Sequence, residues 1–90
     1  MRIRWTPAAA ADLQHISDYL AIYFPRYRQS TLRKLYSTVQ SLRQSPNRGR
    51  PGAEMGTREI LFPPLPYVAV YRLNQDAIEV LRIYHGSQDR

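Results

Sequence analysis

The sequence contains no cysteine among its 90 residues. Disulfide bonds, thiolate metal sites and a cysteine nucleophile are therefore excluded. Long apolar runs are also missing, and the longest falls well short of the roughly 20 residues that a helix needs to cross a bilayer. The first residues, MRIRWTP, lack the apolar segment of a secretory signal peptide. These absences predict a cytoplasmic protein that does not associate with membranes.

Histidine is scarce as well. His15 and His85 are the two histidines, and neither has a second ligand at a metal-binding spacing, so we expect no metal site. The glycines between residues 49 and 56 follow a predicted helix and precede a predicted strand, the reverse of a phosphate-binding glycine loop. The serines lack a recognisable nucleophile motif. No cofactor is predicted.

Acidic residues are few, and the charge is uneven. The sequence has thirteen Lys and Arg residues and seven Asp and Glu residues, which gives a net charge of +6. Lys34 is the one lysine. Arginine binds phosphate and carboxylate in a two-pronged manner that lysine cannot reproduce. The segment 26–58 fits a polyanionic partner, nucleic acid or an acidic protein, and the alternative is a solvated basic face. Its basic residues are Arg26, Arg28, Arg33, Lys34, Arg43, Arg48, Arg50 and Arg58, with Glu54 as the one acid.

The chain length and a hydrophobic content of 43% predict one domain over residues 1–90 with a single modest core. Alternation over Arg2–Trp5 predicts a short strand with Ile3 and Trp5 facing inward. Thr6 and Pro7 then read as the N-cap and first residue of a helix. The apolar stripe of this helix is predicted at Leu13, Ile16, Leu20 and Tyr23.

Phe24-Pro25 interrupts the helical pattern. A second helix is predicted from about Arg26 to Gln44, and the short joint predicts an antiparallel helical hairpin. Its apolar stripe is predicted at Leu32, Leu35, Val39 and Leu42.

The second half of the chain reads as loop and strands. Ser45–Gly56 is too rich in Gly and Pro for a helix. Strands are predicted at Arg58–Phe62, Tyr67–Leu73 and Ala77–His85, with a turn at 74–76 and a tail over Gly86–Arg90. The last strand has apolar residues on both alternating faces, which predicts a central position covered on both sides. Ile78, Val80 and Tyr84 are assigned to one face and Leu81 and Ile83 to the other.

The predicted fold class is therefore α+β. An N-terminal strand and an antiparallel two-helix hairpin are followed by three antiparallel strands. We expect one mostly antiparallel sheet with the helices packed on one face.

Arginine, histidine and tyrosine on the predicted strands are the candidates for chemistry. Arg82 shares a predicted face with Val80 and Tyr84, and it needs either a partner or a cleft. Glu59, Glu79 or a backbone carbonyl is a possible partner for it. Histidine is a common acid–base group in proteins, so His85, at the strand end, is either such a group or an exposed residue.

Two further sets of side chains are candidates for binding. Arg58 opens its strand directly after the glycine loop and is a candidate for phosphate contact. Tyr67 and Tyr71 share one face of the middle strand, where they either pack in the core or stack on bases.

A succession of motifs resembles the RelE/ParE superfamily over nearly the whole chain. This superfamily comprises toxins of type II toxin–antitoxin modules, often called plasmid stabilisation proteins. The motifs are WTPA, then ADL with Ile16, SP at 45–46, GRPG, GTREI, PYVAVYR and IEVLRIYHG. The resemblance implies a small sheet with an N-terminal helical hairpin. It also implies a toxin–antitoxin hetero-oligomer in which the acidic C-terminal segment of a cognate antitoxin wraps the toxin.

The superfamily has two branches, and the resemblance implies different roles in each. RelE-like members cleave mRNA in the ribosome, whereas ParE-like members inhibit DNA gyrase. By position, the catalytic residues of a nuclease would be Arg58, Arg82 and His85, with Tyr84 near the terminal histidine or tyrosine. Tyr67 stands where such nucleases place an arginine, and Lys34 alone cannot supply their usual basic cluster.

We therefore weigh three functions. The favoured one is a ParE-like toxin that inhibits gyrase by binding. The second is a ribosome-dependent mRNA endonuclease in which Arg58 and Arg82 stabilise the phosphorane and His85 is the general acid. The third is a non-toxic nucleic-acid-binding module. The residues expected to contact nucleic acid or the target are Arg48, Arg50, Arg58, Tyr67 and Tyr84.

Overall fold

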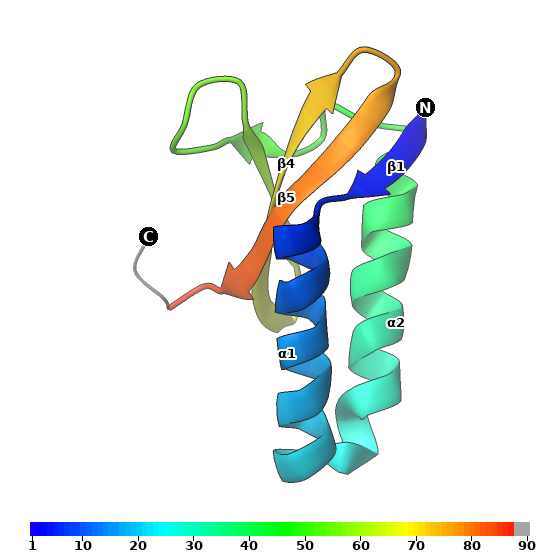
Figure 1. The fold of residues 1–90 in the computed structure, drawn as a ribbon, viewed down its shortest axis with the longest axis vertical. Helices are drawn as coiled ribbons and strands as arrows, with labels where there is room; N and C mark the ends of the chain where they lie inside the picture. Colours follow the sequence, from blue (N-terminus) through cyan, green and yellow to red (C-terminus); the bar gives the residue numbers. More distant parts are fainter. Residues whose placement is uncertain (88–90) are drawn as a thin grey trace.

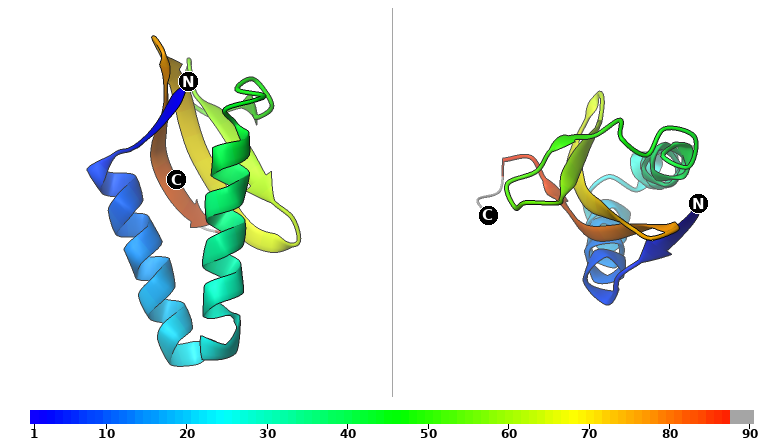
Figure 2. Two further views of the ribbon diagram at one scale, coloured as in Figure 1. Left: turned by 90° about the vertical axis from the view of Figure 1, so that its right-hand side faces the viewer. Right: turned by 90° about the horizontal axis from the view of Figure 1, so that it is seen from above.

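Residues 1–87 are described by a computed structural model. The elements are β1 (Arg2–Trp5), α1 (Pro7–Tyr23), α2 (Pro25–Ser41), β2 (Arg50–Pro51), β3 (Arg58–Phe62), β4 (Leu65–Asn74) and β5 (Ala77–His85). They form one five-stranded sheet in the order β1-β5-β4-β3-β2, in which β1 runs parallel to β5 and the other pairs are antiparallel. Both helices lie on one face of this sheet (Figures 1 and 2). The predicted α+β fold is confirmed; of the predicted tail, residues 88–90 lie outside the described part.

The start of α1 follows the sequence signal. Thr6 is the N-cap, and its Oγ1 accepts a hydrogen bond of 3.2 Å from the backbone N–H of Ala9, while Pro7 opens the helix. The same hydroxyl lies 2.9 Å from the carbonyl oxygen of Val80 in β5. The cap therefore also fixes where α1 leaves the sheet.

The helical hairpin extends past the end of the sheet (Figure 1). Leu35, Val39 and Leu42 are fully buried, as the stripe of the second helix predicted. Tyr23, predicted to face the core, is instead 63% exposed, because it lies at the hairpin tip. The second helix also ends at Ser41 rather than near Gln44. No helix within residues 1–87 is long and apolar enough to cross a membrane.

A bulge in β5 explains the apolar pattern of the last strand. Val70 pairs with Arg82 and Tyr71 pairs with Val80, so Leu81 is an extra residue that reverses the alternation. Ile78, Val80 and Ile83 consequently all belong to the core beneath the helices. The predicted assignment of Arg82 to the face of Val80 is therefore wrong.

The opposite face of β5 is polar rather than covered by a second layer. Glu79 is only 1% exposed there, and it pairs with Arg4 of β1 and with Arg72 of β4, the latter at 2.8 Å. The expected central position of β5, between β1 and β4, is confirmed. The expected covering on both sides is wrong, because the bulge rather than a second helical layer produced the apolar pattern.

The loop over Ser45–Gly56, which carries Arg48 and Arg50 and is called the basic loop, is attached to the core by Tyr71. This side chain is fully buried; its hydroxyl donates to the carbonyl oxygen of Pro46 at 2.7 Å and accepts from the N–H of Gly49 at 2.9 Å. A Cβ on Gly49 would lie 2.7 Å from the Tyr71 ring, so only glycine fits. The loop then forms β2, a two-residue strand that the sequence analysis did not predict. The packing interpretation of Tyr71 is the one that the structure supports.

We expect Tyr71→Phe to lower the free energy of unfolding by about 2 kcal/mol, because it leaves the buried N–H of Gly49 and the partly buried carbonyl of Pro46 without their partner. Urea denaturation followed by circular dichroism measures the change. Tyr36→Phe is the matched control, since Tyr36 is half-exposed and contacts Trp5 through its ring. Equal stability of the two variants would contradict the role given to the Tyr71 hydroxyl.

Candidate functional site

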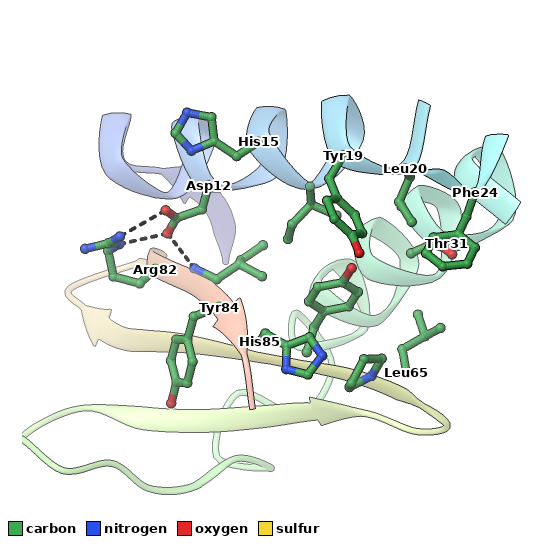
Figure 3. Close-up of a pocket in the computed structure, with 14 residues that line it drawn as sticks. Asp12, His15, Tyr19, Leu20, Phe24, Thr31, Leu65, Arg82, Tyr84 and His85 are labelled. Atoms are coloured by element: carbon green, nitrogen blue, oxygen red, sulfur yellow. Dashed lines mark hydrogen bonds and ion pairs between the residues drawn. The ribbon is translucent and has the colours of Figure 1, made fainter. Parts of the chain in front are cut away.

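A cleft of about 740 Å³ lies between α1 and the sheet, where β4 begins and β5 ends (Figure 3). Helices α1 and α2 supply one wall, and the beginning of β4 and the end of β5 supply the other. The wall is mostly apolar and aromatic, with a polar group at each end. The lining residues include Asp12, Tyr19, Phe24, Leu65, Tyr67, Arg82 and His85.

Tyr67 and His85 face each other on neighbouring strands. They are register partners, and their rings meet edge to face with centroids 5.9 Å apart. Burial, and then the neighbouring Tyr19, raise the pKa of Tyr67 above its ordinary value. The Tyr67 hydroxyl therefore stays protonated at neutral pH and offers a hydrogen-bond donor inside an aromatic wall.

Asp12 of α1 closes the other end of the cleft. Its carboxylate accepts two hydrogen bonds from the Arg82 guanidinium, at 2.7 and 3.0 Å, and a third of 2.9 Å from the backbone N–H of Ile83 (Figure 3). β1 ends opposite Val80, so Asp12 supplies the acceptor that a longer strand would have supplied to β5. The hydrogen bonds, and then the charge, of Asp12 raise the pKa of Arg82.

Arg48 and Arg50 of the basic loop lie with Arg58 of β3 at the edge of the sheet opposite β1. Arg58 donates from Nη1 to the carbonyl oxygens of Asn47 and Gly49, at 3.1 and 2.8 Å, and so holds the loop. Arg48 is exposed beside them. Arg50 binds Oε1 of the buried Glu59 at 3.0 Å.

Arg50 and Tyr84 meet on the face of the sheet that the helices leave open. The Tyr84 hydroxyl lies 3.4 Å from Oε2 of Glu59, whose other oxygen binds Arg50. Figure 3 shows the Tyr84 ring directed away from α1. Glu59 is thus the partner of Arg50, whereas the sequence analysis considered it for Arg82.

The three candidate catalytic residues have different partners in the structure. Arg58 pairs along β4 with Tyr71 and His85 pairs with Tyr67, four residues away, or about 13 Å at ~3.3 Å per residue. Arg58 is bound to loop carbonyls, Arg82 to Asp12, and His85 lies beside Tyr67. Within residues 1–87, no group of three His, Asp or Glu side chains is placed to hold a metal ion.

Sequence reasoning missed much of the cleft. Tyr19 and Phe24, which are 52% and 49% exposed, form its outer rim, and their aromatic character was the one available signal. Sequence analysis assigned Asp12 no role beyond its place in the ADL motif. Its pairing with Arg82, 70 residues away, follows from where β1 stops.

Comparison with known proteins gives consistent matches over nearly the whole chain. A family model described as the ParE toxin of the type II toxin–antitoxin system parDE matches residues 3–90. Two relatives are each 33% identical to this chain over 87 residues. The match to the putative toxin Y4kP of Sinorhizobium fredii covers 97% of this chain and 90% of that protein. The match to toxin RelE2 of Caulobacter vibrioides covers 97% of each. A solved structure of a chromosomal ParDE system from P. aeruginosa superposes with a TM-score of 0.84 at 32% identity and covers 94% of this chain and 95% of that one.

We expect Asp12→Ala to lower the free energy of unfolding by about 2 kcal/mol, because the Ile83 N–H and Arg82 both lose their acceptor. Arg82→Ala should cost less than about 1 kcal/mol, since the Arg82 side chain is 61% exposed. Chemical denaturation of both variants checks the order. Asp18→Ala, which removes an exposed acid of the same helix, is the control, and a larger loss for Arg82→Ala than for Asp12→Ala would refute the capping role.

Proposed function

The chain belongs to the ParE toxin family of type II toxin–antitoxin systems, and on that premise we propose that this toxin acts by binding and inhibiting DNA gyrase. The proposal names a binding protein rather than an enzyme. The observation that supports it most directly is that Arg58 and Arg82 are both engaged in structural contacts, Arg58 with its own loop and Arg82 with Asp12.

Cleavage of RNA would need cations that converge on one phosphate in the transition state. Arg82 is neutralised by the carboxylate of Asp12, and Arg58 is used to hold the carbonyls of its own loop. Tyr67 stands where RelE-like nucleases place an arginine, and its hydroxyl stays neutral. These three facts favour inhibition by binding over catalysis.

The basic loop and the open face of the sheet are the proposed contact surface for the target. Arg48 and Arg50 are exposed there, and Tyr84 lies beside Arg50 over Glu59. Tyr71 and Arg58 fix the loop from beneath, so little conformational entropy would be lost when a partner binds. A rigid, basic loop is suited to an acidic surface of a large enzyme.

The antitoxin is proposed to occupy the cleft. Membership of the family supplies an antitoxin as partner, and the cleft offers an apolar, aromatic wall with a rim that is half-exposed. An acidic segment that folds on binding would bury its apolar side chains here. Its charges would meet the excess of arginine on the toxin.

A ribosome-dependent mRNA endonuclease is the second candidate. The similarity to a relative named RelE2 favours it, as does the position of His85 beside the donor Tyr67 at the mouth of the cleft. In that case His85 would be the general acid, and Arg58 and Arg82 would have to leave their present partners.

The two candidates predict different results for the same variants. If the toxin inhibits gyrase, His85→Ala and Arg82→Ala should inhibit supercoiling by purified gyrase within about threefold of the original protein, since the proposed contact surface does not include them. Neither protein should produce new stops in primer extension on translating ribosomes. Each variant is first shown to be folded by its thermal transition.

An unaffected supercoiling reaction at molar excess of the original toxin would refute the gyrase proposal. Ribosome-dependent stops that vanish in both variants would establish the endonuclease instead. Arg50→Ala is the variant that should weaken inhibition, because it removes a contact residue from the proposed surface. The toxin concentration needed to inhibit gyrase should rise about tenfold.

Tyr19→Asp should weaken binding of the cognate antitoxin about tenfold or more, because it removes aromatic contact from the cleft and adds a repelling charge. Tyr27→Asp is the matched control, since Tyr27 is 57% exposed and lies outside the cleft lining. Titration calorimetry measures both. Equal weakening by the two variants would show that the antitoxin does not use the cleft.

A further inference from the structure

A second, polar groove lies on the other side of the helical hairpin. It measures about 280 Å³ and runs between the C-terminal half of α2 and the end of β3, with the basic loop at one end. Its lining includes Lys34, Ser37, Thr38 and Ser41 from α2 and Arg48 from the loop. On the sheet side the groove is bordered by residues 61–63.

The polar residues of α2 in this groove form one stripe. Lys34, Thr38 and Ser41 follow each other at spacings of four and three residues, which places them on one helix face. Ser37 lies beside them, and its hydroxyl donates to the carbonyl oxygen of Lys34 at 3.3 Å. The Ser41 hydroxyl likewise donates to the carbonyl oxygen of Thr38, at 2.6 Å, and both serine hydroxyls would rotate to donate to an incoming oxygen. Hydroxyl groups and a cation thus face one narrow space.

The two cations of the groove differ from the four arginines that form ion pairs within the protein. Arg4, Arg50, Arg72 and Arg82 each pair with a carboxylate. In the part of the chain that the structure describes, neither Lys34 nor Arg48 forms such a pair, and no carboxylate lines the groove. The sequence contains no Asp or Glu between Asp18 and Glu54. The positive charge of this groove is therefore not compensated internally.

Arg48 is also held in position by its backbone. Its N–H donates to the carbonyl oxygen of Ser45 at 3.1 Å, and the next residue, Gly49, is bound to the buried Tyr71 hydroxyl. The loop therefore presents this side chain from a fixed point beside α2. Lys34 lies two helical turns before Ser41, so the two cations bracket the hydroxyls.

We propose that this groove binds the phosphate backbone of DNA, independently of base sequence and in the absence of gyrase. A phosphodiester offers charged oxygens for the two cations and acceptors for the hydroxyls. An amphipathic acidic peptide would also require apolar contact, which the cleft beside α1 offers to a far greater extent. The proposal goes beyond gyrase inhibition because it assigns the toxin a direct contact with nucleic acid.

Fluorescence anisotropy with a labelled 20-base-pair duplex tests this at several salt concentrations. The original toxin should bind with a Kd of about 10⁻⁴ to 10⁻⁶ M, typical of contacts to the backbone. The double variant Lys34→Ala, Arg48→Ala should bind more weakly to every sequence. The slope of log Kd against log salt should fall by about 1.8, which is the value for two lost phosphate contacts.

The double variant Arg26→Ala, Arg33→Ala is the matched control, because it removes the same charge from exposed positions of α2 outside the groove. Its salt slope should fall by less than about 0.5. A third variant, Thr38→Val, should weaken binding without changing the slope, since it removes a hydroxyl and no charge. Thermal unfolding establishes that all three are folded.

Three results would overturn the proposal. Equal losses in the two double variants would show that binding reflects overall charge. An original toxin that binds no duplex at low salt would exclude backbone contact. Preferential loss of binding to a poly-glutamate peptide, with DNA binding retained, would assign the groove to an acidic protein. Supercoiling assays on the same variants are read separately, so failure here leaves the gyrase proposal intact.

Discussion

The two hydrogen bonds of the Tyr71 hydroxyl connect the core of this protein to its basic loop. The ring is buried between the helices and the sheet, and the hydroxyl fixes Pro46 and Gly49 from below. Arg58 then adds bonds to Asn47 and Gly49. These hydrogen bonds therefore determine the position of each surface that carries Arg48 or Arg50. An aromatic side chain is well suited to the task, because its body contributes to the core while its polar end reaches the loop.

The architecture was predictable from the sequence because its signals are local. Thr6-Pro7, Phe24-Pro25 and the apolar stripe of α2 each determine a boundary or a buried face without reference to distant residues. The bulge at Leu81 was not predictable in this way, since one extra residue depends on register with β4 and leaves no mark in composition. Because the sequence analysis did not include this extra residue, it assigned Arg82 to the wrong face of the strand and wrongly expected a second layer over the sheet.

The site was less predictable than the fold for a related reason. Sequence analysis placed Tyr67 on the middle strand and His85 at the end of the last strand, and the structure brings the two side chains together. The partners of the arginines depended on contacts between distant elements: Asp12 for Arg82, Glu59 for Arg50 and Glu79 for Arg4 and Arg72. Charge counts give the excess of arginine but cannot say which arginines are neutralised.

Internal carboxylates neutralise some arginines of the basic surface and, among the described residues, leave other cations unpaired. The parts of this surface therefore differ in how well they can bind an anionic partner. A guanidinium already bound to a buried acid contributes to the fold and offers an incoming partner only its remaining donors. Arg48 and Lys34 keep their full charge, and they lie on the α2 side of the hairpin, whereas the aromatic cleft lies on the α1 side. An antitoxin seated in the cleft would therefore leave the polar groove open. Inhibition of the toxin would then depend on which surface the rest of the antitoxin chain covers. A path over the basic loop is the one that blocks Arg48 and Arg50 together.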